Sequence, residues 1–157
     1  MSTRVADGVG LIARLVLGGV FVVAGALKVT TPEAMAKATQ AYQLLPHDLA
    51  AYVGYALPTI EIVLGLLLVL GLFTRTAAIL TSLLLVAFVV GIAQAWARGL
   101  TIDCGCFGGG GTVSAEDTSY LQRIIEDLGL LACGARTSWR PSSALSLDRA
   151  LFRPAPA

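Results

Sequence analysis

The sequence predicts an all-α integral membrane protein, built as a bundle of four transmembrane helices. Of its 157 residues, 56% are hydrophobic and only 13% are charged, which leaves too little polar surface to cover a water-soluble protein of this size. The mean hydropathy of +0.79 agrees with this prediction. The net charge is only +1 and the Lys and Arg residues are scattered, so a nucleic-acid-binding protein, which needs a concentrated cationic face, is excluded.

Three long apolar runs predict the first three helices, at about residues 9–29, 52–73 and 76–97. Each run is long enough to cross the roughly 30 Å of hydrocarbon in a bilayer as a helix. The first run contains Arg14 near its start and Lys28 at its end, whose long side chains are expected to reach the membrane surface. The second run contains one ionisable residue, Glu61, and the third contains none.

The fourth predicted helix, at about residues 120–135, is short and carries charges in its first half. Arg123, Glu126 and Asp127 lie there, and a charge at the centre of a membrane helix costs about 2.5–3.5 kcal/mol. Arg123 and Asp127 stand four residues apart on one helix face, so they are expected to neutralise each other. We therefore predict a transmembrane domain over residues 1–135, followed by a polar cytoplasmic tail over residues 136–157.

Arginine placement predicts the orientation of the four helices. With four crossings, most arginines fall on one side of the membrane, namely Arg4, Arg14, Arg75, Arg136, Arg140, Arg149 and Arg153. The positive-inside rule assigns that side, and both termini with it, to the cytoplasm. The long segments 30–51 and 98–119, which contain few cations, then lie outside. A cleaved signal peptide over residues 1–26 remains the competing interpretation.

The second outside segment contains a Cys-Gly-Cys sequence, Cys104-Gly105-Cys106, followed by Phe107 and four glycines. Cysteines at this spacing can form a small-ring disulfide, and Gly105 gives the backbone the freedom that so tight a ring requires. A strained, exposed disulfide in an oxidising compartment is readily exchanged. The spacing therefore predicts a redox-active pair.

Two other interpretations of the cysteine pair remain open. It could be a static clip that shapes the loop, or two thiolate ligands of a metal ion, for which His47 and Asp103 are the further candidate donors. The third cysteine, Cys133, is predicted to lie near the opposite membrane face as a small buried apolar residue.

Several stretches resemble the DoxX-like membrane proteins. Residues 21–28 match an F-x-x-A-G-x-x-K signature, Pro58, Glu61 and Gly65 match a P-x-x-E-x-x-x-G pattern, and residues 71–75 are similar to the turn that follows. The stretch Asp103-Cys104-Gly105-Cys106-Phe107-Gly108 is similar to one branch, the methylamine-utilisation protein MauE family.

The MauE resemblance covers about residues 9–135. It implies a four-helix protein of the bacterial cytoplasmic membrane that takes part in maturing methylamine dehydrogenase, a disulfide-rich periplasmic enzyme, together with a thioredoxin-like protein. The resemblance assigns no catalytic role to any residue. The short, charged fourth helix and the polar tail depart from the usual family pattern.

Five polar side chains are predicted to lie in the outer half of the bundle, beneath the cysteine loop: Lys28, Glu61, Gln94, Arg123 and Asp127. Ionisable residues inside a membrane are candidates for a functional site, because the cost of desolvating them must be offset by a partner. Lys28 and Glu61 are either a structural ion pair or part of a ligand-binding or proton-handling pocket that also includes Gln94 and Asp127.

Backbone features near these side chains lead to two further expectations. Pro58, three residues before Glu61, is expected to loosen backbone hydrogen bonding and to open a cavity there. Gly18, Gly25 and Gly65 are best explained as positions where helices pack closely.

The predicted function is thiol–disulfide exchange through Cys104 and Cys106 with an extracytoplasmic thioredoxin-like or substrate protein. Arg123 is the candidate for stabilising the thiolate, and a membrane quinone is the candidate electron acceptor. A non-enzymatic assembly subunit, with the disulfide as a clip, is the first alternative. A metal-handling or carrier protein is the second.

Overall fold

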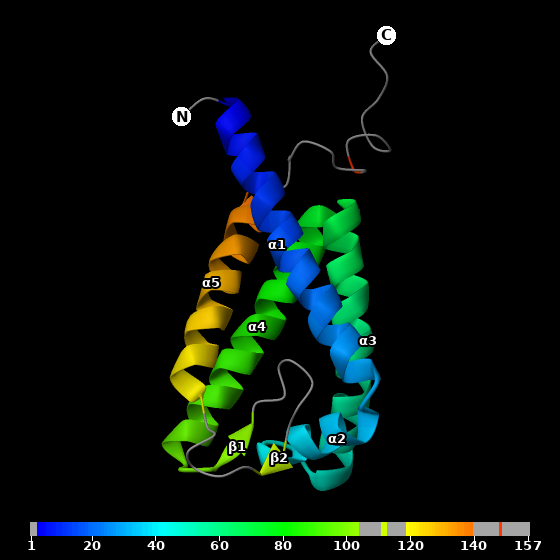
Figure 1. Ribbon diagram of the computed structural model, residues 1–157, viewed down its shortest axis with the longest axis vertical. Coiled ribbons are helices and arrows are strands. Elements are labelled where there is room, and N and C mark those ends of the chain that lie inside the picture. The colour runs from blue at the N-terminus through cyan, green and yellow to red at the C-terminus, as the bar shows by residue number, and fades with distance from the viewer. Residues whose placement is uncertain (1–2, 104–110, 113–118, 140–147, 149–157) are drawn as a thin grey trace.

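The structure, a computed structural model, describes residues 3–103, 111–112, 119–139 and 148. In chain order its elements are α1 (Thr3–Val29), α2 (Pro32–Ala41), α3 (His47–Leu70), α4 (Thr74–Ala97), β1 (Ile102–Asp103), β2 (Gly111–Thr112) and α5 (Tyr120–Trp139). The four long helices α1, α3, α4 and α5 run side by side, and α2 lies with the β1–β2 sheet at one end (Figure 1). The start of α1, the turn between α3 and α4 and the end of α5 lie at the other end (Figure 1).

Three helices of the described chain are long and apolar enough to cross a membrane: α1 from Asp7 to Val29, α3 and α4. Large hydrophobic side chains point outward from all three, for example Ile12, Val63 and Leu83, which are 63%, 50% and 61% exposed. Such a surface suits lipid and would be poorly solvated by water. The prediction of membrane helices is therefore confirmed for three segments, and α5 is not among them.

The helix bounds differ from the predicted ones at several ends. Helix α3 begins at His47 and not at residue 52, since Pro46 precedes it and Asp48 lies in its first turn, where an acidic residue favours a helix start. It ends at Leu70 because Gly71 adopts a left-handed conformation with φ of 71°. Helix α5 continues to Trp139, so the first residues assigned to the polar tail belong to a helix.

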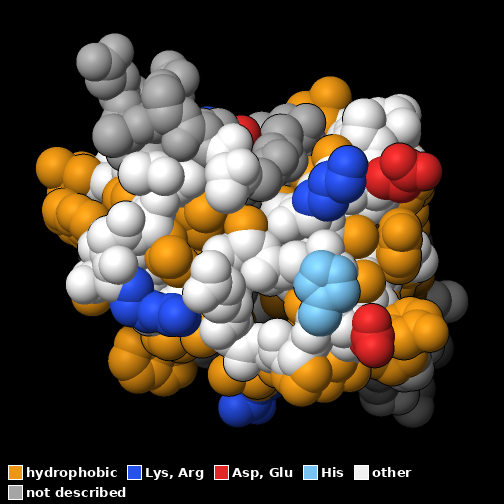
Figure 2. Space-filling model, turned by 90° about the horizontal axis from the view of Figure 1, so that it is seen from below, with side chains coloured by type: hydrophobic (Ala, Val, Ile, Leu, Met, Phe, Trp, Pro, Cys, Tyr) orange, Lys and Arg blue, Asp and Glu red, His pale blue; other side chains and the backbone are white. Residues whose placement is uncertain are grey.

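Helix α2 was not predicted from the sequence. Thr31 precedes it, Pro32 occupies its first turn, and one face buries Met35 and Ala36 against the bundle. A Cβ atom added at Gly54 of α3 would lie 2.6 Å from the carbonyl oxygen of Met35, so α2 sits directly on the α3 backbone. Figure 2 views this end of the molecule, where charged side chains lie among polar and backbone atoms and hydrophobic side chains gather towards the rim.

Helices α1 and α3 pack backbone to backbone. A Cβ atom at Gly18 would lie 2.9 Å from the carbonyl oxygen of Gly65, and one at Gly65 would lie 2.8 Å from that of Gly18. At Gly25 an added Cβ would lie 2.8 Å from the carbonyl oxygen of Pro58. The prediction that these glycines allow close packing is confirmed.

The N-terminus of α4 is capped by a residue far away in the sequence, Asp148. The backbone N–H groups of Phe73 and Thr74 donate to its two carboxylate oxygens at 2.8 and 2.9 Å, and its own N–H donates to the carbonyl of Gly71 at 3.0 Å. Burial alone would raise the pKa of Asp148, but the hydrogen bonds from Thr74 and Phe73 and the charge of Arg14 lower it below its ordinary value of 3.8. Asp148, assigned to the polar tail, is therefore attached to the helical bundle.

Candidate functional site

A buried ion pair joins the last turn of α1 to the middle of α3. Lys28 Nζ donates to Glu61 Oε1 at 2.6 Å, and the two residues are only 4% and 2% exposed. This contact confirms that Lys28 and Glu61 are partners. The burial of Lys28 also corrects the expectation that its side chain reaches the membrane surface. The same correction applies to Arg14, which is 1% exposed. Each side chain is enclosed by helix packing, and Lys28 has an anionic partner that offsets part of its desolvation.

The ammonium group of Lys28 has a second contact, with the face of an aromatic ring. Its nitrogen lies 5.5 Å from the ring centroid of Phe88 in α4, within the range of a cation–π interaction. Sequence analysis missed Phe88, because an aromatic residue in an apolar helix is indistinguishable from ordinary packing. Lys28 thus connects α1 to both α3 and α4.

A third ionisable side chain, Asp127 of α5, also faces the interior. It is 7% exposed and interacts electrostatically with Lys28 and Glu61. Within the described part of the chain, Asp127 Oδ2 and Glu61 Oε2 are buried without a hydrogen-bond partner. We call Lys28, Glu61 and Asp127 the buried charge cluster. It contains two carboxyl groups and one ammonium, and the positive charge of Arg123 also acts on Asp127.

Arg123 contacts a different partner from the one expected. Its Nη1 atom lies 2.9 Å from Glu126 Oε2, and the side chains of this pair are 26% and 37% exposed. Asp127, predicted to neutralise Arg123, turns into the bundle but still interacts electrostatically with the arginine, whereas Glu126 stays at the surface beside it. Arg123 therefore lies at the rim of the bundle, outside the buried charge cluster.

Gln94, the remaining predicted pocket residue, has a structural contact. Its Nε2 donates to the carbonyl of Tyr42 at 2.9 Å, and its Oε1 accepts from Arg98 at 3.1 Å. These bonds fasten the end of α2 to α4. Of the four residues assigned to the pocket, the structure brings Lys28, Glu61 and Asp127 together and places Gln94 in this separate network.

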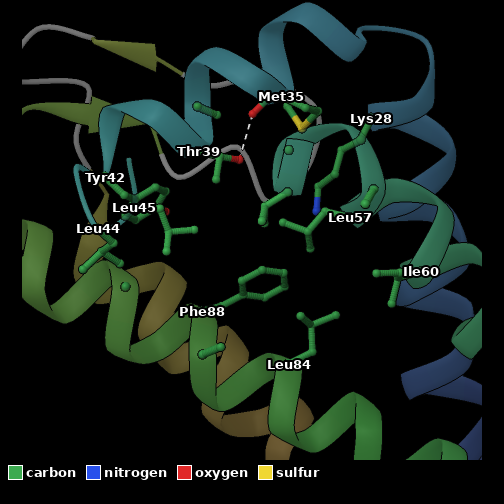
Figure 3. Close-up of a pocket in the computed structure, with 16 residues that line it drawn as sticks. Lys28, Met35, Thr39, Tyr42, Leu44, Leu45, Leu57, Ile60, Leu84 and Phe88 are labelled. Atoms are coloured by element: carbon green, nitrogen blue, oxygen red, sulfur yellow. Dashed lines mark hydrogen bonds between the residues drawn. The ribbon is translucent and has the colours of Figure 1, made fainter. Parts of the chain in front are cut away.

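A cavity of about 380 Å³ lies beside the buried charge cluster, between α2, α3 and α4. Figure 3 shows Lys28 reaching towards it, with Leu57 and Ile60 of α3 and Leu84 and Phe88 of α4 among its walls.

Pro58 has no N–H to donate to the carbonyl of Gly54, which lines the cavity. The expected cavity near Pro58 is present, although its roof, α2, was not predicted.

Cys104 and Cys106 lie outside the described residues, but both ends of their loop are described. Asp103 of β1 pairs with Gly111 of β2 in an antiparallel register. Next to Asp103, the N–H of Ile102 donates to the Tyr120 hydroxyl at 3.1 Å, and that hydroxyl donates to the carbonyl of Leu100. The sheet therefore holds the two ends of the cysteine loop together, and Tyr120 of α5 anchors the strand that precedes the loop.

The other sequence candidates have ordinary surroundings. Within the described ranges, no group of three or more His, Cys, Asp and Glu side chains could hold a metal ion. His47, considered as a metal donor, lies 3.0 Å from the Gln40 side chain. Cys133 is a free cysteine that packs against the main hydrophobic core, as its predicted apolar role requires, but it is only partly buried.

A model of the family described as methylamine utilisation protein MauE matches residues 6–140. The chain belongs to the MauE family. Comparisons with curated proteins and with solved structures find no significant match. The family match includes the buried charge cluster, the cavity and the cysteine loop, while the resemblance to DoxX-like proteins stays a prediction. Together, the match and the three apolar helices indicate a MauE-family membrane protein associated with methylamine utilisation.

Proposed function

We propose that this MauE-family protein exchanges thiols and disulfides through Cys104 and Cys106 with an extracytoplasmic protein during maturation of a secreted enzyme. The observation that carries the proposal is the antiparallel pairing of the two strands that flank the cysteine loop. In this pairing Asp103, next to Cys104, lies opposite Gly111. The single residue between Cys104 and Cys106 keeps their sulfurs within reach of a small-ring disulfide, and the paired strands close the loop that contains them. Membership of the MauE family supports the link to methylamine utilisation.

We further propose that α5 is a fourth membrane crossing, so that the protein is a four-helix bundle with cytoplasmic termini and an extracytoplasmic cysteine loop. Support comes from the distribution of side chains around α5. Its outward face carries Leu121, Ile125 and Leu128, which are 60%, 61% and 49% exposed, while Asp127 is buried. This pattern is the reverse of a water-exposed helix and is suited to lipid. The arginine asymmetry supports bacterial cytoplasmic-membrane orientation.

The proposed exchange balances without a further reagent. A thiolate of a reduced partner attacks one sulfur of the Cys104–Cys106 disulfide, forming a mixed disulfide and releasing the other cysteine as a thiolate that takes up a proton. The second partner thiol loses its proton and attacks the mixed disulfide. The partner leaves oxidised, and the chain retains two thiols, having gained two electrons and two protons. Arg123, at the surface near the start of α5, is the proposed positive charge that favours the released thiolate.

Trapping of mixed disulfides tests this proposal. Cys104→Ser and Cys106→Ser are each expressed in cells, free thiols are blocked with acid and alkylating agent, and covalent adducts are identified. We expect one of the two variants to accumulate a defined extracytoplasmic partner. Cys133→Ser is the matched control and should accumulate none.

The outcomes separate exchange from a static clip. An adduct in neither cysteine variant, with the wild-type pair remaining oxidised in strongly reducing buffer, would reject exchange and favour an assembly subunit. Free thiols in every buffer, with a metal that co-purifies only when both cysteines are intact, would instead favour the metal-handling alternative.

A further inference from the structure

The cavity between α2, α3 and α4 combines apolar walls with one charged side chain. At about 380 Å³ it falls in the size range of small-molecule sites. Its walls include Leu57, Ile60, Leu84 and Phe88, and Lys28 is the charged residue that lines it (Figure 3). Such walls favour a ligand with an apolar body.

The cavity opens onto the apolar surface of the bundle. Three of its lining residues, Leu44, Leu45 and Ile60, are also 55%, 41% and 48% exposed at the surface. Helices α3 and α4 diverge from their shared turn towards the end that α2 covers (Figure 1). A long hydrocarbon tail could therefore leave the cavity sideways while the rest of the molecule stays inside.

The charges around the cavity select the head of the ligand. An ammonium group has three N–H donors, and within the described chain Lys28 makes one hydrogen bond, to Glu61. An anionic head beside Lys28 would be repelled by Glu61, whose carboxylate already lies 2.6 Å from the same ammonium. A cationic head would be repelled by Lys28 itself. A neutral hydrogen-bond acceptor avoids both penalties and uses a free donor.

We propose that this cavity binds a neutral, lipid-soluble carbonyl compound of the quinone type. A ring carbonyl accepts a hydrogen bond from Lys28, the ring lies near Phe88, and the tail extends past Ile60 into the bilayer. This assignment deepens the proposed function, because it provides a site for the electron acceptor that thiol oxidation requires. The binding itself depends on the cavity and not on the cysteines.

Two probes of equal tail length test the head and the tail separately. The purified full-length protein in detergent is titrated with a benzoquinone carrying a decyl chain and with decylbenzene, and binding is measured by equilibrium dialysis. We expect saturable binding of the quinone that is roughly tenfold or more tighter than that of decylbenzene, as a hydrogen bond to a charged donor would give. Equal affinities would overturn the proposal and leave only a cleft for hydrocarbon.

Variants locate the binding at the cavity. Ala87→Phe fills the cavity from α4, and we expect it to abolish saturable quinone binding. Ala93→Phe is the matched control, because Ala93 lies on the same helix, is exposed and does not line the cavity. Unchanged quinone binding in Ala87→Phe would overturn the assignment.

Two further variants separate this inference from the proposed exchange. Lys28→Met combined with Glu61→Gln removes both members of the ion pair and leaves Asp127 as the one ionisable member of the buried charge cluster. This variant should bind both probes with similar affinity. A variant with Ser at positions 104 and 106 should bind the quinone as the wild type does. Loss of quinone discrimination in that variant would contradict a site formed by the cavity alone, whatever the trapping experiment shows.

Discussion

A few ionisable residues in the interior determine how much charge is buried in this protein. Lys28 serves two carboxyl groups, one through a direct contact of 2.6 Å with Glu61 and one through the electrostatic interaction with Asp127. Phe88 adds the face of its ring as a third, neutral contact. The arrangement is therefore asymmetric. Loss of the Lys28 ammonium leaves two carboxyl groups without a cation in the cluster, whereas loss of Glu61 leaves one ammonium and one carboxyl group.

That asymmetry leads to a prediction for substitutions at the ion pair. Lys28→Leu should destabilise the fold by about 3–5 kcal/mol, because removing one partner leaves uncompensated buried charge. Glu61→Leu should cost less, since Asp127 remains available to Lys28. The double variant should lie closer to the wild type than Lys28→Leu alone. Free energies of unfolding in detergent measure all four corners of the cycle, and strictly additive losses would reject direct coupling.

The ionisable residues of this cluster could be predicted from the sequence, because Lys28 and Glu61 interrupt runs that are otherwise apolar. Phe88 and the cavity could not, since an apolar side chain in an apolar helix carries no signal of what it faces. The direct contact of Arg123 could not be predicted, because Glu126 and Asp127 are both within helical reach and only tertiary packing determines which one turns inward. Arg123 forms an ion pair with Glu126, and its charge also acts on Asp127.

At the scale of secondary-structure elements, the long helices were easier to predict than their ends. Hydropathy locates α1, α3 and α4 because each needs a long apolar run to span lipid. Helix α2 is short and has one buried face, so it resembles a polar loop in the same analysis. The start of α4 lacks a local capping side chain and instead uses Asp148, a partner that no local pattern can reveal.

The Asp148 cap predicts a pH-dependent stability. Asp148→Ala should lower the free energy of unfolding by about 0.5–2 kcal/mol at neutral pH, the usual cost of losing a helix cap. Because folding lowers the pKa of Asp148, its contribution is fully present above the ordinary value of 3.8 and is lost as the pH falls through the lower folded value. The gap between the wild type and Asp148→Ala should therefore narrow in acid, as the contribution of the charge is lost.

Thermal unfolding in a series of buffers measures this gap. Asp148→Asn is the matched control, since its side chain still accepts a hydrogen bond but has no charge to titrate in this range. Its difference from Asp148→Ala should not change with pH. A gap between wild type and Asp148→Ala that is constant down to strong acid would contradict the cap.

At the scale of the whole molecule, the four long helices place α2, the β1–β2 sheet and the cavity at one end, and the Asp148 cap at the other (Figure 1). The number of crossings determines whether these two ends face different compartments. Three crossings follow from apolar length, whereas a fourth by α5 depends on whether lipid covers Leu121, Ile125 and Leu128. Hydropathy alone could not decide this, since the charges of α5 are averaged with its apolar face.

Labelling from outside the cell tests the orientation. In a variant whose three cysteines are replaced by Ser, single cysteines are introduced by Gly110→Cys or Ser142→Cys. A membrane-impermeant thiol reagent should modify the first in intact cells and the second only after lysis. Modification of both positions from the same side would contradict four crossings and leave α5 outside the membrane.

The distance in sequence between Asp148 and the helix that it caps determines the order in which the chain can be assembled. Thr74 and Asp148 are 74 residues apart. At a synthesis rate of about 5–20 residues per second, the carboxylate follows the start of α4 by roughly 4–15 s. Helix α3 is complete when that interval begins and α4 is completed within it, but throughout the interval the N–H groups of Phe73 and Thr74 must rely on water. The start of α4 is therefore uncapped while the preceding helices are assembled, and a residue close to the end of the sequence provides the cap.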